Sequence, residues 1–196
     1  MSDPSVDYAV AGGVATLVLN QPAKLNAMTY DMWLAVPDCI AKAEADRNVR
    51  VIVVTGAGEK AFCAGADISQ FGEKRTGEEA VKAYEAAVSA GMKSISDAKK
   101  PTVARIKGFA FGGGMALAMC TDLRIASDNA RFRIPAARLG LGYAFSNIEA
   151  LVHRIGLGPT SDLLLTARIV DGPEAQRLGI VNKMWPACLL YTSPSP

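Results

Sequence analysis

Hydrophobic and polar residues alternate along the N-terminal segment DYAVAGGVATLVLN, residues 7–20. Alternation with a period of two is typical of strands, and the Gly12-Gly13 pair in its middle predicts the turn of a β-hairpin. The second strand of this hairpin carries Ala15, Leu17 and Leu19 on one face and Val14, Thr16 and Val18 on the other. The chain therefore opens with a predicted pair of strands.

A helix is predicted after the hairpin. Thr29 is a candidate N-cap residue and Asp31 falls in the first turn of a helix that runs to about Ala45. Pro37 lies inside this segment and removes one backbone hydrogen bond. We therefore expect the helix to kink or to divide at Pro37.

Two β-branched runs, RVIVVTG at 50–56 and TVARIK at 102–107, are typical of strands buried on both faces. A polar, alanine-rich helix is predicted between them, at about 78–95. The later predicted elements are short strands at 123–126 and 130–132, a helix at 146–155 with Ser146 as its N-cap, and a helix at 159–166. Strands that alternate with helices predict an α/β fold.

Composition narrows the class of protein. The 196 residues are 50% hydrophobic and 20% charged, with a formal net charge of +2, and are expected to form one globular domain. The near-neutral charge argues against a nucleic-acid partner. Four scattered cysteines and one histidine match no zinc-ligand spacing. No membrane span or secretory leader is predicted, so we expect a soluble, cytoplasmic protein with no metal.

The last ten residues, ACLLYTSPSP at 187–196, differ from the rest of the chain because they carry no charge and end in a Ser-Pro repeat. Two interpretations are open. The segment is a disordered native tail, or it is a non-native translation of a sequencing adapter. The predicted core domain accordingly covers residues 1–186.

Two glycine-rich segments invite nucleotide-binding interpretations, and both fail. Residues 56–61 fit the G-x-G-x-x-A pattern, but no long amphipathic helix follows them. Residues 112–114 are three glycines without the Lys and Ser or Thr of a phosphate-binding loop. A different chemistry fits better: the turns FCAGAD and FGGGMA each follow an apolar strand, and each could supply one backbone N–H to the same ligand oxygen. Such a pair would form an oxyanion hole.

Five segments in order resemble the crotonase, or enoyl-CoA hydratase/isomerase, superfamily. They are KLNAM at 24–28, AFCAGADI at 61–68, GFAFGGGMALAMCTDLRIA at 108–126, RFRIPAARLGLG at 131–142 and the closing TARIVDGPEAQRLGIVNKMWP at 166–186. The resemblance covers about residues 8–186. It implies a spiral of ββα units of the kind shared by ClpP and crotonase, with the C-terminal helical part of the family truncated here.

The same resemblance implies an acyl-CoA thioester as ligand, with coenzyme A as part of the substrate and no separate cofactor. By motif position, the backbone N–H groups of Ala64 and Gly113 hold the thioester oxygen. The implied substrate contacts are Lys24, Leu25, Ala66, Asp67, Ile68, Gly112, Pro135, Ala136 and Leu139. Family members assemble as trimers or pairs of trimers, and the same is expected for the full-length protein.

Both glutamates that hydratases of this family use for proton transfer are replaced, by Ala116 and Ala136. Each such group contributes about 10² to 10⁴ in rate, so ordinary hydration is not expected. Tyr143, Asn147 and Glu149 lie just past the RLGLG segment. Tyr143 is the candidate substitute acid, with packing as the alternative, and Glu149 is expected on an exposed helix face. His153 is expected to be solvated.

The sequence leaves several functions open. One is an enolate chemistry without the glutamates, such as isomerisation, decarboxylation or thioester hydrolysis. Another is an acyl-CoA-binding subunit without turnover. A serine hydrolase on the same spiral would need a nucleophile elbow, and no G-x-S-x-G motif is present.

Overall fold

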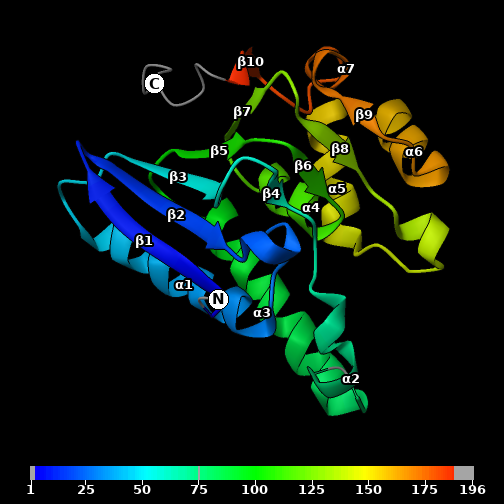
Figure 1. Ribbon diagram of the computed structural model, residues 1–196, viewed down its shortest axis with the longest axis horizontal. Coiled ribbons are helices and arrows are strands. Elements are labelled where there is room, and N and C mark those ends of the chain that lie inside the picture. The colour runs from blue at the N-terminus through cyan, green and yellow to red at the C-terminus, as the bar shows by residue number, and fades with distance from the viewer. Residues whose placement is uncertain (1–2, 75, 188–196) are drawn as a thin grey trace.

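The computed structural model describes residues 3–74 and 76–187, whose strands form two sheets (Figure 1). The larger sheet, in spatial order, consists of β1 (Ser5–Ala11), β2 (Val14–Asn20), β3 (Val51–Gly56), β5 (Thr102–Ile106), β7 (Leu123–Ser127) and β10 (Lys183–Trp185). The smaller sheet consists of β4 (Ala61–Cys63), β6 (Phe109–Phe111), β8 (Arg131–Arg133) and β9 (Val170–Asp171).

The helices follow the strands in regular alternation. The α-helices are α1 (Tyr30–Ala45), α2 (Phe71–Lys74), α3 (Glu78–Ser96), α4 (Gly113–Met119), α5 (Phe145–Ile155), α6 (Leu157–Thr166) and α7 (Gly172–Arg177). Three 3-10 helices are η1 (Pro22–Lys24), η2 (Ile68–Gln70) and η3 (Ala136–Leu139). In Figure 1, α1 and α3 lie together beneath the larger sheet, and α2 extends away from the body of the molecule.

The chain repeats one supersecondary unit. β3, β5 and β7 each join the larger sheet, and the strand after each of them, β4, β6 or β8, joins the smaller sheet before a helix follows. Along both sheets these strands are parallel to their neighbours. The predicted α/β spiral of ββα units is therefore confirmed.

The predicted hairpin and its two faces are also confirmed. β1 pairs antiparallel with β2, and Ala11 lies opposite Val14 across the glycine turn. Leu17 on β2 is fully buried and in register with Val54 and, through it, with Ala104. These aliphatic side chains form one face of the larger sheet, which packs into the core beneath it.

Helix α1 begins where the sequence predicts it, since the Thr29 hydroxyl accepts the Met32 N–H at 3.2 Å. It continues without division through Pro37 to Ala45. Pro37 cannot donate to the carbonyl of Trp33, four residues earlier. That carbonyl faces Gly91 of α3, where an added Cβ would lie 3.2 Å from its oxygen, so the missing bond coincides with a close contact between the two helices.

The start of α5 differs from the prediction, and most of the predicted tail is not described by the structure. Helix α5 begins at Phe145 with Ala144 at the N-cap position, so Ser146 lies inside the first turn and is not the N-cap. The extended backbone of Ala144 already turns the chain into the helix, and no side chain caps it. The predicted tail at 187–196 lies outside the described residues except for Ala187, and its origin stays a prediction.

Candidate active site

The three consecutive glycines occupy the turn between β6 and α4, and two of them, Gly112 and Gly114, are required by the backbone geometry. Gly112 has a φ of +52°, a backbone conformation that side chains disfavour. A Cβ on Gly114 would lie 2.2 Å from the carbonyl oxygen of Cys63 in β4. Gly113 stands between them as the first residue of α4, so its N–H has no carbonyl within the helix to bond.

The second glycine-bearing turn follows β4 and runs alongside the KLNAM segment. The Met28 N–H donates to the Gly65 carbonyl at 2.7 Å, and the Asp67 N–H donates to the Met28 carbonyl at 2.9 Å. These two bonds flank Ala66 and form an isolated parallel bridge between Met28 and Ala66. The N–H of Ala66 is left pointing away from this ladder.

The two turns meet at their backbone nitrogens. The Ala66 nitrogen lies 3.7 Å from the position of a Cβ on Gly113, and the Gly113 nitrogen lies 3.4 Å from that of a Cβ on Gly65. Among the residues that the structure describes, neither N–H has a hydrogen-bond acceptor. The arrangement therefore offers two neighbouring backbone donors to a ligand oxygen.

The prediction that Ala64 supplies one of these donors is wrong. Its N–H donates to the carbonyl of Leu25 at 3.0 Å and is used in joining β4 to the KLNAM segment. The N–H of Ala66, two residues later, faces away from the KLNAM segment, because Gly65 with a φ of +108° interrupts the extended backbone between the two alanines. The sequence analysis named Ala66 only as a substrate contact.

The helix behind the turn carries no acid or base. Ala116 is 4% exposed in the first turn of α4, and its methyl group is part of the core. Ala136 opens η3 and packs against the same core. The preceding Pro135 lies on the turn, with its Cδ 3.7 Å from the position of a Cβ on Gly112. The two alanines therefore lie on different elements, and neither supplies a carboxylate.

Tyr143 is brought to this turn by the segment between η3 and α5. Its hydroxyl donates a long hydrogen bond of 3.4 Å to the carbonyl of Gly112, next to the donor at Gly113. Burial is the larger cause that raises the pKa of Tyr143 above its ordinary value of 10.0, and the electrostatic interaction with Cys120 raises it further. The phenol is therefore protonated at neutral pH and can act as a donor.

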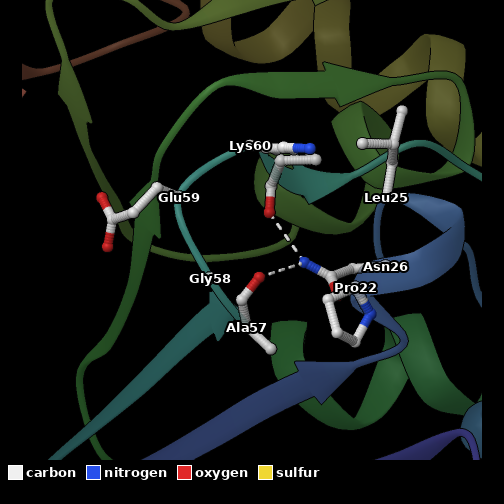
Figure 2. Close-up of a pocket in the computed structure, with 8 residues that line it drawn as sticks. Pro22, Leu25, Asn26, Ala57, Gly58, Glu59 and Lys60 are labelled. Atoms are coloured by element: carbon white, nitrogen blue, oxygen red, sulfur yellow. Dashed lines mark hydrogen bonds between the residues drawn. The ribbon is translucent and has the colours of Figure 1, made fainter. Parts of the chain in front are cut away.

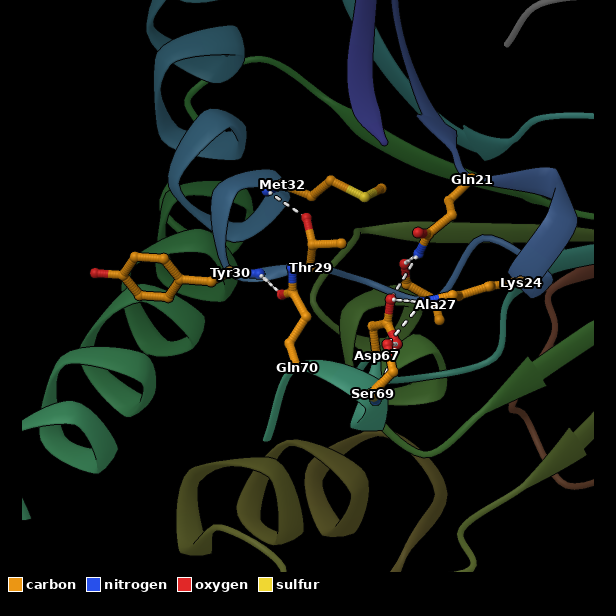
Figure 3. Close-up of polar contacts among 9 residues, drawn as sticks. All are labelled: Gln21, Lys24, Ala27, Thr29, Tyr30, Met32, Asp67, Ser69 and Gln70. Atoms are coloured by element: carbon orange, nitrogen blue, oxygen red, sulfur yellow. Dashed lines mark hydrogen bonds and ion pairs between the residues drawn. The ribbon is translucent and has the colours of Figure 1, made fainter. Parts of the chain in front are cut away.

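Asp67 is held entirely by the protein (Figure 3). Asp67 is 4% exposed in the folded chain, and its carboxylate forms an ion pair with Lys24 at 2.8 Å. Burial raises the pKa of Asp67, but hydrogen bonds from Lys24 and Ser69 outweigh that effect and leave the pKa below the ordinary 3.8. Lys24 also donates to the Ser69 hydroxyl at 2.6 Å. Lys24 and Asp67, both predicted to contact the substrate, therefore form hydrogen bonds with groups of the protein itself.

A hollow of about 220 Å³ lies beside this network, between the KLNAM segment and the loop that precedes β4 (Figure 2). Leu25, in the left-handed conformation with φ of 53°, forms part of its wall. Asn26 holds the loop at 57–61, which forms another part of the wall, since its amide donates to the carbonyls of Ala57 at 2.9 Å and Ala61 at 2.8 Å. Glu59 and Lys60 lie on the same loop.

The remaining predicted residues lie apart from the two donors or on the surface. Ile68 is 74% exposed at the start of η2, and Leu139 is 62% exposed at the end of η3. Glu149 and His153 are both exposed on α5, as the solvent-facing interpretation expects. Burial raises the pKa of the Cys63 thiol to about 12, which keeps it protonated beneath the turn.

Within the described part of the chain, the acidic, histidine and cysteine side chains form no cluster suited to a metal ion. Residues 3–74 and 76–187 also contain no helix that is long and apolar enough to cross a membrane.

The spiral of ββα units places the chain in the crotonase class of folds, since it superposes on solved structures of enoyl-CoA hydratase/isomerase proteins. The sequence model of the enoyl-CoA hydratase/isomerase family matches residues 9–192. The chain belongs to this family.

Curated relatives carry hydratase names. The chain is 38% identical to a short-chain-enoyl-CoA hydratase of Clostridium acetobutylicum over 88% of its own length and 66% of the relative. It is 37% identical to a crotonyl-CoA hydratase of Syntrophomonas wolfei over 87% of its own length and 65% of the relative. The chain thus spans about two thirds of the length of these relatives.

Solved structures agree in fold. An enoyl-CoA hydratase/carnithine racemase from Magnetospirillum magneticum superposes with a TM-score of 0.92 at 29% identity, over 95% of this chain and 70% of that one. An enoyl-CoA hydratase/isomerase family protein from Hyphomonas neptunium superposes with a TM-score of 0.92 at 36% identity, over 96% of this chain and 72% of that one.

Proposed function

We propose that the chain binds an acyl-CoA thioester and stabilises the negative charge that develops on its carbonyl oxygen as an enolate forms. The observation that supports this is the pair of neighbouring N–H groups of Ala66 and Gly113, which have no acceptor in the described structure. A preorganised donor of this kind is worth about 3 to 4 kcal/mol of barrier. Family membership and the relatives' names point to the same ligand class.

The reaction is proposed to be one that needs an oxyanion donor but no carboxylate base. Alanine at positions 116 and 136 can neither activate water nor return a proton to carbon. Loss of carbon dioxide from a malonyl-type CoA ester meets this condition, because breaking the carbon–carboxylate bond leaves its electron pair on the enolate. The proton that the α-carbon then takes up comes from water or from a neutral donor.

Tyr143 is the side chain we propose as that donor. Its hydroxyl lies next to the Gly112 turn, and burial raises its pKa, which favours the neutral, proton-carrying form. Removing the hydroxyl as Tyr143→Phe should lower turnover while leaving the backbone donors in place.

The remaining substrate contacts, the localisation and the assembly are proposed by analogy with the family. Leu25 and Ile68 are proposed to line the coenzyme A side, and Pro135 and Leu139 the acyl side. No cofactor beyond the coenzyme A of the substrate is proposed.

We also propose a cytoplasmic protein that assembles as a trimer or a pair of trimers. A subunit that binds acyl-CoA without turnover is the second candidate, supported by the same two alanines.

The test measures binding and turnover with the same protein. Calorimetry with acetyl-CoA asks whether a thioester binds, and assays with crotonyl-CoA, a 3-enoyl-CoA and malonyl-CoA ask which reaction follows. We expect binding, carbon dioxide release from malonyl-CoA, and negligible hydration of crotonyl-CoA. Binding without any turnover would favour the second candidate, and failure to bind any acyl-CoA would reject both.

A gain of function checks the two alanines directly. Ala116→Glu combined with Ala136→Glu should raise crotonyl-CoA hydration by on the order of 10² or more, because each acid or base contributes about 10² to 10⁴. Circular dichroism must first show that the variant is folded, since both positions pack against the core. Hydratase-level turnover of crotonyl-CoA by the unaltered protein would contradict the assignment.

A further inference from the structure

The buried carboxylate of Asp67 is saturated by groups of the protein itself. Its Oδ2 accepts from Lys24 Nζ at 2.8 Å and from Gln21 Nε2 at 3.4 Å. Its Oδ1 accepts from the Ser69 backbone N–H at 3.1 Å and from the Ser69 hydroxyl at 2.7 Å. With 4% exposure and these four donors, the carboxylate is not presented to a ligand.

These contacts tie together the two segments that hold Ala66. Gln21 donates from the same amide to the carbonyl of Ala27 at 2.6 Å, next to Met28, whose backbone brackets Ala66 (Figure 3). Asp67 is the residue directly after Ala66. The backbone bonds at Met28 therefore hold the peptides on both sides of Ala66, and the side-chain network holds the next residue, Asp67.

We propose that Asp67, together with Lys24 and Gln21, is a positioning network that aims the Ala66 N–H at the thioester oxygen. This inference rests on the proposed function and changes the predicted role of Lys24 and Asp67. They were expected to hold coenzyme A by direct contact. In the proposed role they act through the peptide of Ala66.

The electrostatics explain why small changes in this network matter. Removing the ammonium of Lys24 leaves a buried carboxylate without its ion-pair partner, a situation that a structure relieves by moving the group toward water. Changing Asp67 to Asn replaces one acceptor oxygen by an NH₂ group, which then faces donors already in place, either Lys24 Nζ and Gln21 Nε2 or the two donors of Ser69. Either change shifts the neighbouring Ala66 peptide, and charge stabilisation by a backbone donor depends steeply on its placement.

The experiment separates carbonyl polarisation from coenzyme A affinity. 2,4-Hexadienoyl-CoA absorbs at longer wavelength when its thioester oxygen is polarised, so the red shift on binding reports the donor pair. Coenzyme A itself has no thioester oxygen, and its dissociation constant reports the remaining contacts. The variants are Asp67→Asn, Lys24→Met and the double variant. Asp97→Asn is the matched control, since it breaks an exposed ion pair with Lys93.

We expect the unaltered protein and the control to show the red shift, and each single variant to lose most of it. The dissociation constant of coenzyme A should stay within about twofold in the same variants, well below the tenfold change that 1.4 kcal/mol would cause. The double variant should be no worse than Asp67→Asn, because the two side chains act through one contact.

Three results would overturn the inference. An undiminished red shift in both single variants would show that the network does not position Ala66, while leaving the proposed function intact. A parallel loss of coenzyme A affinity would make Lys24 and Asp67 ligands. Absence of a red shift in the unaltered protein would reject the proposed function along with the inference. If Asp67→Asn does not fold, the half-exposed Lys24→Met decides the question alone.

Discussion

At the scale of single residues, the site depends on glycines that keep side chains out. Gly114 lies against the carbonyl of Cys63, and Gly65 has a φ of +108° where its turn passes Gly113. The sequence could predict that such turns supply backbone donors, because glycine clusters after strands indicate close approach. It could not decide between Ala64 and Ala66, because that choice depends on which N–H the carbonyl of Leu25 consumes.

Gly114→Ala should destabilise the fold by about 3 kcal/mol or more, since the new methyl group would meet a backbone oxygen at 2.2 Å that cannot move aside. Gly158→Ala is the matched control. It lies in α6 with no atom within 4 Å of its Cβ position and should stabilise by up to about 1 kcal/mol. Urea unfolding of both variants checks the pair, and a neutral Gly114→Ala would contradict the packing described here.

At the scale of elements, prediction succeeded where pattern and capping agree. The Thr29 cap, the β-branched run of β3 and the alternation of β2 each reflect a local preference that the packed structure also satisfies. Pro37 is the instructive exception. The expected division of the helix does not occur, and the contact of Trp33 with α3 is one that the sequence does not reveal. The expected kink stays a prediction.

Gly91→Ala tests the contact between α1 and α3. Alanine favours a helix over glycine by about 1 kcal/mol, but its methyl group would lie 3.0 Å from Trp33 Cε3 and 3.2 Å from the Trp33 carbonyl. Trp33 is only 1% exposed and has no room to retreat. We therefore expect a net loss of about 1 to 3 kcal/mol in the free energy of unfolding. A stabilised variant would mean that the two helices separate readily.

At the scale of the whole molecule, the family motifs predicted the spiral more securely than periodicity did. Periodicity indicated strands and helices but could not assign β3 and β4 to different sheets, because both are short apolar runs. Neither the motifs nor the periodicity located the exposed apolar side chains near η3, α5 and α6. Large hydrophobic side chains are exposed over η3, α5 and α6 and in the segments between and after them: Leu139, Leu141, Phe145, Leu157, Leu165 and Ile169.

We expect these exposed side chains to favour self-association of the 196-residue chain, because apolar side chains are stabilised by leaving water. Phe145 and Leu165 are the most exposed of them, at 78% and 79%. Phe145→Ser combined with Leu165→Ser should shift sedimentation velocity profiles toward monomer. Val10→Ser, on the remote strand β1, is the control. A chain that is already monomeric at high concentration would show that the surface is compatible with water.

The close contact of Gly114 with Cys63 has a consequence for how this protein tolerates mutation. Every amino acid except proline carries a backbone N–H, so a replacement at Ala66 that fits cannot remove its donor, whereas a side chain at Gly114 would displace the turn itself. Positions 116 and 136, in contrast, contribute a side chain and not a backbone donor, so a carboxylate gained or lost there does not remove the N–H groups of Ala66 and Gly113. Charge stabilisation and proton transfer can therefore change independently: a saturation library should be depleted of variants at Gly65, Gly112 and Gly114 long before it is depleted at Ala136.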